Sequence, residues 1–254
     1  MVILVIGVIK SDIRYDVFKG DDKYIVSNHI NDFVDIDVVI LPFLGIDSYY
    51  NIIGTKLNLI DILRQNQVLK IFTGLANKTL KELCMAKDIE LYEMLKDEVF
   101  VIDNSLLTAA GIIDYLQKKG QCVNDMCIFI MGYGNISSSL ARLLKAYNTD
   151  FVIYPNNEME RKFILLDQYK LGDISDLKKY NVVINTIPYN YIGDYNVFKD
   201  TSIIDFESKT YVFDVVKLMD LNIEYNVYSS IPSKYLATSA GKLVFNFVEK
   251  HLKI

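Results

Sequence analysis

Residues 127–154 read CIFIMGYGNISSSLARLLKAYNTDFVIY, and they decide how the second half of the chain folds. An apolar run at 127–131 predicts a buried strand, which leads through Gly132 and Gly134 into the pattern of an amphipathic helix. A second apolar run, at 151–154, follows about twenty residues after the glycines. This order of strand, glycine turn, helix and strand is that of a dinucleotide-binding unit, which directs backbone N–H groups and a helix dipole at a phosphate.

The glycine turn is therefore the predicted cofactor site. The residues expected to line it are Gly132, Tyr133, Gly134, Asn135, Ile136 and Ser137. We expect the diphosphate to meet free amide hydrogens where the chain bends at Tyr133. Ser137 takes the third position of the G-x-G-x-x-G fingerprint; it is small enough for close helix–strand packing, and its hydroxyl is a candidate phosphate contact. The alternative is that the two glycines only turn the chain between a strand and a helix.

The end of the second strand bears on the choice of cofactor. An acid there normally holds the ribose hydroxyls of NAD. Here Tyr154 and Asn156 are the expected contacts, no acid follows the strand directly, and Arg161 and Lys162 come one turn later. Because no carboxylate would repel a 2′-phosphate, the pattern slightly favours NADP over NAD. The alternative is a plain turn before the next helix.

Composition excludes several classes of protein. With 254 residues, 51% of them hydrophobic, the chain is long enough for one large or two modest domains. A net charge of −5 without a basic stripe argues against nucleic acid or an anionic membrane as partner. The N-terminal MVILVIG is too short to span a membrane. Three cysteines without metal-site spacing and only two histidines predict no metal site and reduced thiols in a cytoplasmic protein.

Short apolar runs rich in Val and Ile recur along the whole chain. They lie at 2–6, 24–26, 38–41, 68–72 and 89–92 in the first half, and at 127–131, 151–154, 182–186, 202–206 and 223–225 in the second. Connections long enough for helices predict an α/β fold of two doubly wound, Rossmann-like domains with parallel sheets and a cleft between them. The expected divisions are a first domain at 1–103, a bridging helix at 104–120, an NAD(P)-binding domain at 121–238 and a C-terminal helix at 239–254.

Short strings in a fixed order link the chain to a known family. They are Asp12-Ile13-Arg14, Leu41-Pro42, Gly74-Leu75-Ala76-Asn77, Tyr92-Glu93, Asp97-Glu98, Asn104, Thr108-Ala109-Ala110-Gly111, Ile184-Asn185-Thr186-Ile187-Pro188, Asp205, Ser208-Lys209, Ile231-Pro232 and Ser239-Ala240-Gly241. Together with the glycine turn, they resemble the A subunit of dipicolinate synthase, which is the dehydrogenase-like component of that enzyme in spore-forming bacteria.

The resemblance implies an architecture and an activity. It implies a substrate domain, an NAD(P)-binding domain and a C-terminal helix that folds back onto the first domain. It also implies oxidation of a dihydropyridine dicarboxylate to dipicolinate in sporulation, with the flavoprotein-like B subunit of dipicolinate synthase as partner. Whether the chain also forms a homo-oligomer is left open by the sequence.

A dicarboxylate substrate needs cations and hydrogen-bond donors. The candidates are Arg14, which follows the first strand, Asn104 and Thr108 near the expected hinge, and Lys209, which follows a later strand. Arg14 has the alternative of an ion pair with Asp12 or Asp16, and Asn104 and Thr108 have that of capping the bridging helix.

One loop is expected beside the nicotinamide. Thr186, Ile187 and Pro188 end a strand next to the cofactor site, so Ile187 is a candidate apolar wall against the ring and Pro188 would stiffen the loop. The alternative is an ordinary strand terminus with a turn proline. No histidine stands out for proton transfer, so the catalytic residue is left open.

Departures from the family pattern keep other functions open. Ala110 stands where the family has a Glu, and Lys209 runs into Thr210 where the family has Pro-Gly-Gly. A relative that binds cofactor without catalysis is therefore the alternative to an active oxidoreductase. A 2-hydroxyacid dehydrogenase shares the two-domain plan but fits a chain so poor in histidine less well.

Overall fold

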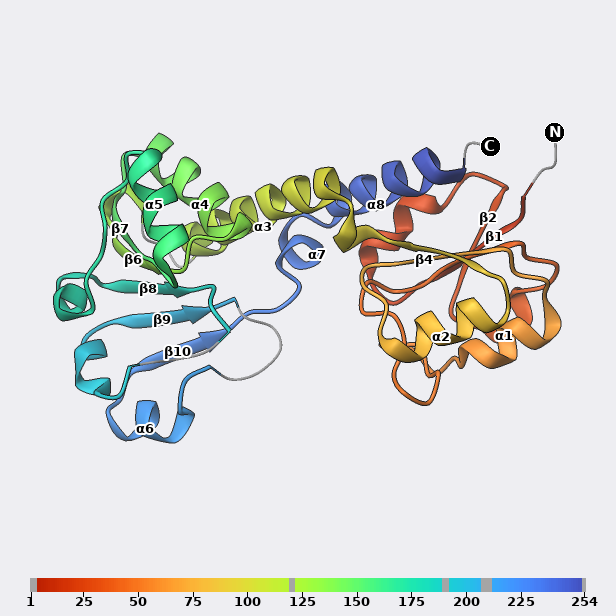
Figure 1. The fold of residues 1–254 in the computed structure, drawn as a ribbon, viewed down its shortest axis with the longest axis horizontal. Helices are drawn as coiled ribbons and strands as arrows, with labels where there is room; N and C mark the ends of the chain where they lie inside the picture. Colours follow the sequence, from red (N-terminus) through yellow and green to blue (C-terminus); the bar gives the residue numbers. More distant parts are fainter. Residues whose placement is uncertain (1–3, 119–121, 189–191, 207–211, 253–254) are drawn as a thin grey trace. The chain divides into compact units, whose positions relative to one another are not determined.

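The computed structural model describes residues 4–118, 122–188, 192–206 and 212–252 (Figure 1). The chain divides into two compact units: unit 1 is Met1–Asn104 with Leu236–Ile254, and unit 2 is Ser105–Tyr235. Within the described residues, each unit has one five-stranded sheet in which all strand pairs are parallel. The predicted α/β class with two doubly wound parallel sheets is confirmed.

Unit 1 is built on the sheet order β2-β1-β3-β4-β5. Its strands are β1 (Ile6–Ile9), β2 (Tyr24–Ser27), β3 (Val38–Ile40), β4 (Lys70–Thr73) and β5 (Glu90–Glu93). Its helices are α1 (Leu59–Gln65), α2 (Lys78–Ala86) and α8 (Ala237–Leu252), with the 3₁₀ turns η1 (Ile13–Phe18), η2 (Ile30–Asp32) and η3 (Met94–Lys96).

Unit 2 is built on the order β10-β9-β8-β6-β7. Its strands are β6 (Cys127–Met131), β7 (Asp150–Tyr154), β8 (Val182–Asn185), β9 (Ser202–Asp205) and β10 (Glu224–Val227). Its helices are α4 (Asn135–Ala146), α5 (Glu158–Leu166), α6 (Val215–Asp220) and α7 (Ile231–Tyr235), with the 3₁₀ turns η4 (Val123–Asp125), η5 (Ile174–Lys179) and η6 (Tyr195–Phe198).

The two sheets share one topology. Counted within its own unit, each sheet has its first strand between the second and the third. The strand order reverses at β1 in unit 1 and at β6 in unit 2, and ligands of such sheets bind beyond the carboxyl ends of the strands at this reversal. The register in unit 2 pairs Met131 with both Tyr154 and Asn185, so the three strand ends lie level there.

The first strand differs from its predicted position at 2–6. The strand is Ile6–Ile9, and Gly7 lies inside it rather than in a turn after it. A Cβ added at Gly7 would lie 2.8 Å from Ile36 Cδ1, so the residue is small because its neighbours pack tightly against the backbone. A glycine within an apolar run often marks the end of a strand, but here the apolar run continues through Val8 and Ile9 and so does the strand.

Helix α3 (Glu98–Lys118) runs from unit 1 into unit 2 and begins six residues before the predicted residue 104. The carboxylate of Asp97 accepts a hydrogen bond from the amide of Phe100 at 2.9 Å, which caps this earlier start. Among the described residues, α3 is the one helix with the length and apolar composition of a membrane span. Half of its most apolar window is buried inside the protein.

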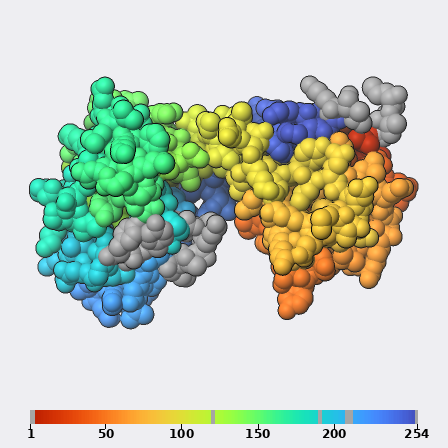
Figure 2. Space-filling view, in the orientation of Figure 1, coloured from red at the N-terminus to blue at the C-terminus, as the bar shows by residue number. Residues whose placement is uncertain are grey.

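Helix α8 packs on η1, so the last helix of the chain belongs to the same compact unit as its first strands (Figures 1 and 2). The ring of Phe245 lies 5.4 Å from that of Phe18, centroid to centroid. At Gly241 the helix approaches η1 so closely that an added Cβ would lie 2.4 Å from the carbonyl oxygen of Arg14. A backbone atom cannot yield as a flexible side chain can, so this contact needs glycine.

We therefore expect Gly241→Ala to lower the free energy of unfolding by about 1–3 kcal/mol, through overpacking against η1. Helix propensity alone predicts the opposite, a gain of about 1 kcal/mol. Chemical denaturation followed by circular dichroism measures the difference, with Asn246→Ala at an exposed position of α8 as control. A more stable Gly241→Ala protein would contradict the packing of α8 on η1.

Candidate functional site

The turn after β6 depends on a backbone conformation that favours glycine. Gly132 has φ +95°, and its amide donates to the carbonyl of Tyr154 at 2.9 Å. A Cβ added here would lie 2.6 Å from Ile187 Cγ2 and 2.8 Å from Thr186 Oγ1. Both the left-handed backbone and the close approach of the loop after β8 therefore require glycine at this position.

The N-terminus of α4 faces open space. Gly134 is the N-cap, and a Cβ added to it would meet no atom within 4 Å. The first bond along α4 runs from the amide of Ser138 to the carbonyl of Gly134 at 2.9 Å. The amides of Asn135 and Ile136 precede that bond and have no acceptor among the described residues. Two free donors, the positive end of a helix dipole and an open approach suit an anion.

The amide of Tyr133 is not one of these donors. It donates to Glu160 Oε2 at 2.9 Å, which corrects the expectation that a diphosphate would meet it. The Tyr133 ring is 7% exposed, and its hydroxyl donates to the carboxylate of Asp167. Burial, and then the neighbouring Asp167 carboxylate, raises the pKa of Tyr133 far above its usual value, so the hydroxyl stays a donor. The candidate anion site therefore excludes the amide of Tyr133 and is confined to the start of α4.

Ser137 joins α4 to the loop after β8. It is fully buried, and its hydroxyl lies 2.6 Å from that of Thr186, which donates to the carbonyl of Met131 at 2.8 Å. The Thr186 hydrogen is used on Met131, so Ser137 donates to Thr186. The expected packing role of a small third residue fits this geometry, whereas the expected phosphate contact of the Ser137 hydroxyl does not.

Glu160 is the residue of this region that sequence reasoning missed. Its Oε2 also accepts from the amide of Asn156 at 2.7 Å, just past the end of β7. The carboxylate of Glu160 thus joins the glycine turn to the segment after β7. The sequence has no acid directly after that strand, so an acid was not expected to lie there. The signal in the sequence was the pair Asn157 and Glu160, the N-x-x-E spacing of a capping box.

The loop after β8 is held by a buried polar network. Asn185 Nδ2 donates to the carbonyl of Ile187 and to Asp205 Oδ1, both at 2.9 Å. Asp205 Oδ2 in turn accepts from the hydroxyl of Tyr225 at 2.6 Å, and Asn185 and Asp205 are both fully buried. Ile187 is 3% exposed and its side chain lies close to Gly132, so most of its apolar surface is used within the protein. Its expected role as an apolar wall against the nicotinamide stays a prediction. Among the residues of this loop that the structure describes, which end at Pro188, that proline is exposed.

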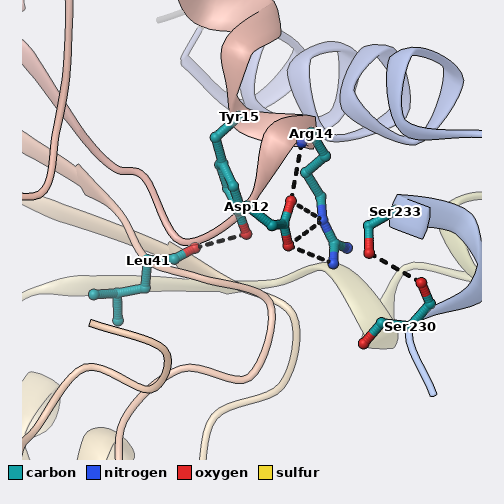
Figure 3. Close-up of polar contacts among 6 residues, drawn as sticks. All are labelled: Asp12, Arg14, Tyr15, Leu41, Ser230 and Ser233. Carbon is teal, nitrogen blue, oxygen red and sulfur yellow. Dashed lines mark hydrogen bonds and ion pairs between the residues drawn. The ribbon is translucent and has the colours of Figure 1, made fainter.

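Arg14 lies in η1, just past the carboxyl end of β1. The carboxylate of Asp12 binds the guanidinium of Arg14 through both of its oxygens (Figure 3). Oδ1 and Oδ2 accept from Nε at 3.0 Å, and Oδ2 also accepts from Nη2 at 2.9 Å. The ring of Phe43 lies 5.1 Å from Arg14 Cζ. The sequence allows Arg14 to pair with Asp12 or with Asp16. In the structure Arg14 pairs with Asp12, whereas Asp16 pairs with Lys10 and Lys19.

The guanidinium of Arg14 keeps unused donors despite its burial. Its side chain is 9% exposed, and Nη1 donates to no described residue. Tyr15 beside it is fully buried and donates to the carbonyl of Leu41 at 3.3 Å, which ties η1 to the end of β3 (Figure 3). Two donors on Nη1 are therefore held in a defined place at the carboxyl end of the sheet of unit 1.

Of the other three predicted substrate residues, the structure describes two, Asn104 and Thr108. Asn104 and Thr108 lie one helical turn apart on α3; Thr108 is 7% exposed and Asn104 is partly buried. The division between the units falls after Asn104. Lys209 lies outside the described residues.

Known structures share this fold over nearly the whole chain. No family model and no curated protein matches the sequence. The fold is that of two-domain NAD-dependent dehydrogenases: the NAD complex of a D-isomer specific 2-hydroxyacid dehydrogenase from Lactobacillus delbrueckii ssp. bulgaricus superimposes with a TM-score of 0.51 at 14% identity, covering 97% of this chain and 96% of its own.

Two structures of the A subunit of dipicolinate synthase are more similar. The Bacillus halodurans protein has a TM-score of 0.79 at 19% identity, over 99% of this chain and 98% of its own. The Bacillus subtilis protein has a TM-score of 0.76 at 20% identity, over 99% and 96%. The resemblance is thereby confirmed at the level of the fold, which is what such identities establish.

We expect Ser137→Ala to make the protein less stable than the control Ser139→Ala by about 1 kcal/mol, because a buried acceptor on Thr186 loses its donor. The control variant has the same change of helix propensity in α4. Thermal denaturation measures the stabilities, and an NADH titration of both variants is expected to give equal affinities. A tenfold loss of affinity in Ser137→Ala alone would place its hydroxyl on the phosphate after all.

Proposed function

We propose that the protein is an NAD(P)-dependent oxidoreductase whose unit 2 binds the cofactor diphosphate at the N-terminus of α4. The observation that carries the proposal is the open space over Gly134, together with the two amides of Asn135 and Ile136 that lack acceptors among the described residues. The site lies where the strand order of the sheet reverses, the usual ligand position of such sheets. The fold shared with two-domain dehydrogenases supports the same function.

The residues of the chain fit a dinucleotide at this position. Gly134 allows close approach of a diphosphate, and the amides of Asn135 and Ile136 would donate to it. The loop at Thr186, held by Asn185 and Asp205, lies next to the glycine turn and would position the nicotinamide end. When bound, the nicotinamide supplies the hydride acceptor, and the task of the protein is to hold it rigidly. The buried Asn185–Asp205 network provides that rigidity.

The proposed substrate is a dicarboxylate of the dihydrodipicolinate type, oxidised to dipicolinate. Arg14 supports this, because its Nη1 keeps donors for a carboxylate while Asp12 fixes the guanidinium plane. Asn104, Thr108 and Lys209 are proposed as further polar contacts of the substrate. The likeness to the A subunit of dipicolinate synthase supports this substrate class. A flavoprotein-like partner protein and a role in the cytoplasm of a sporulating cell are proposed with it, from the family resemblance of the sequence.

A cofactor-binding protein without catalysis is the second candidate. Ala110 favours it, since a carboxylate that the family resemblance leads us to expect is missing from α3. An oxidation assay on dihydrodipicolinate, with and without the candidate partner protein, separates the two candidates. Turnover supports the oxidoreductase, whereas tight cofactor binding without turnover in either condition supports the second candidate.

Gly134→Val tests the cofactor site. We expect the melting temperature to stay within about 2 °C, because the added side chain enters open space. The affinity for the dinucleotide should fall at least about tenfold, because the same side chain blocks the approach to the amides of α4. Fluorescence titration measures the affinity, with Gly193→Val, at another glycine in open space, as control. Unchanged affinity in Gly134→Val would remove the cofactor from this turn.

Arg14→Ala tests the substrate site. Loss of the guanidinium should raise the KM for the dicarboxylate about tenfold or more, with a smaller change in the cofactor affinity. Arg64→Ala is the control, because Arg64 is an exposed arginine of the same unit that pairs with Asp61. A large fall in melting temperature with normal kinetics would instead assign Arg14 to the structural core of unit 1.

A further inference from the structure

Glu160 places a carboxylate at the junction of two strand ends. It lies in α5, yet its Oε2 is 2.9 Å from the amide of Tyr133 and 2.7 Å from that of Asn156. The first amide belongs to the turn after β6 and the second to the segment after β7. In dinucleotide-binding units the adenosine ribose lies in this place, beyond the second strand and beside the glycine turn. The carboxylate therefore occupies the edge of the proposed cofactor site where the ribose would rest.

The second oxygen of this carboxylate is available to a ligand. Oε1 of Glu160 accepts no hydrogen bond from any residue that the structure describes, and it is not among the buried atoms without a partner. Glu160 also has no ion pair within the described part of the chain. Arg161 and Lys162 follow it directly but are both exposed. At this junction, the partly buried Glu160 thus carries a charge without an ion pair and one oxygen without a donor, among the residues that the structure describes.

Capping of α5 does not account for this arrangement. The amide of Glu160 donates to Asn157 Oδ1 at 2.9 Å, which is half of a capping box. In a complete box the carboxylate would return to the amide of Asn157 itself. Here it reaches past the helix to Asn156 and to Tyr133 on another element, so its position serves the turn as well as the helix.

We propose that Glu160 makes this site select NAD over NADP. Oε1 accepts a hydrogen bond from a hydroxyl of the adenosine ribose, and the charge repels a 2′-phosphate in the same place. The inference rests on the proposed function, since it concerns the same cofactor site. It reverses the preference for NADP suggested by the sequence, which depended on the lack of an acid directly after β7.

Titration of NADH and NADPH against the full-length protein tests the proposal. We expect the wild-type protein to bind NADH at least about tenfold more tightly than NADPH. In Glu160→Gln the ratio should fall to about threefold or less, because the amide oxygen still accepts from Tyr133 and Asn156 but the charge is gone. Glu158→Gln removes the same charge from an exposed position of the first turn of α5 and should leave the ratio unchanged.

A second measurement needs no variant. ADP-ribose should compete with NADH at least about tenfold better than its 2′-phosphorylated form does, even if Glu160→Gln folds poorly. Equal or tighter binding of NADPH by the wild-type protein, or a ratio unchanged in a folded Glu160→Gln, would overturn the role of Glu160 and leave the oxidoreductase proposal standing. Failure of both dinucleotides to bind would overturn both proposals.

Discussion

At Gly132 the chain turns out of β6 with φ +95°, and a Cβ added there would lie 2.6 Å from the side chain of Ile187. This close approach sets the spacing between the turn after β6 and the loop after β8. The buried bridge from Ser137 to Thr186 to the carbonyl of Met131 holds the same spacing from the other side. Two residues further on, a Cβ added at Gly134 would meet no atom within 4 Å, and the amides of Asn135 and Ile136 have no acceptor among the described residues.

In each unit, a carboxylate orients the hydrogen-bond donors of the proposed site. In unit 2, Glu160 accepts a hydrogen bond from the amide of Tyr133, whereas the amides of Asn135 and Ile136 have no acceptor among the described residues. In unit 1, Asp12 orients the guanidinium of Arg14 without consuming Nη1. In both places a carboxylate fixes the hydrogen-bond donors that contact it. The charged groups, the carboxylate of Glu160 in unit 2 and the guanidinium of Arg14 in unit 1, therefore have defined positions. Such preorganisation lowers the entropic cost of binding a charged ligand.

The apolar runs of the sequence predicted the features that depend on neighbouring residues, namely strand positions and the fold class. The strand Cys127–Met131 has the bounds that its apolar run indicated. The spacing of such runs also predicted an α/β fold with two sheets of parallel strands. Tertiary contacts were beyond those patterns. The reach of Glu160 from α5 to the turn after β6, and the burial of Ile187 against Gly132, depend on how separate elements pack. The start of α3 at Glu98 depends on one cap, in which Asp97 accepts from the amide of Phe100.

The most direct test of the central claim is a titration of the ¹⁵N-labelled protein with NADH, followed by amide resonances. We expect the amides of Asn135 and Ile136 to shift most on binding, because they would donate hydrogen bonds to the diphosphate. The amide of Tyr133, already bonded to Glu160, should shift less. Binding of NADH that leaves the amides at the start of α4 unmoved, or no binding at millimolar concentration, would contradict the account.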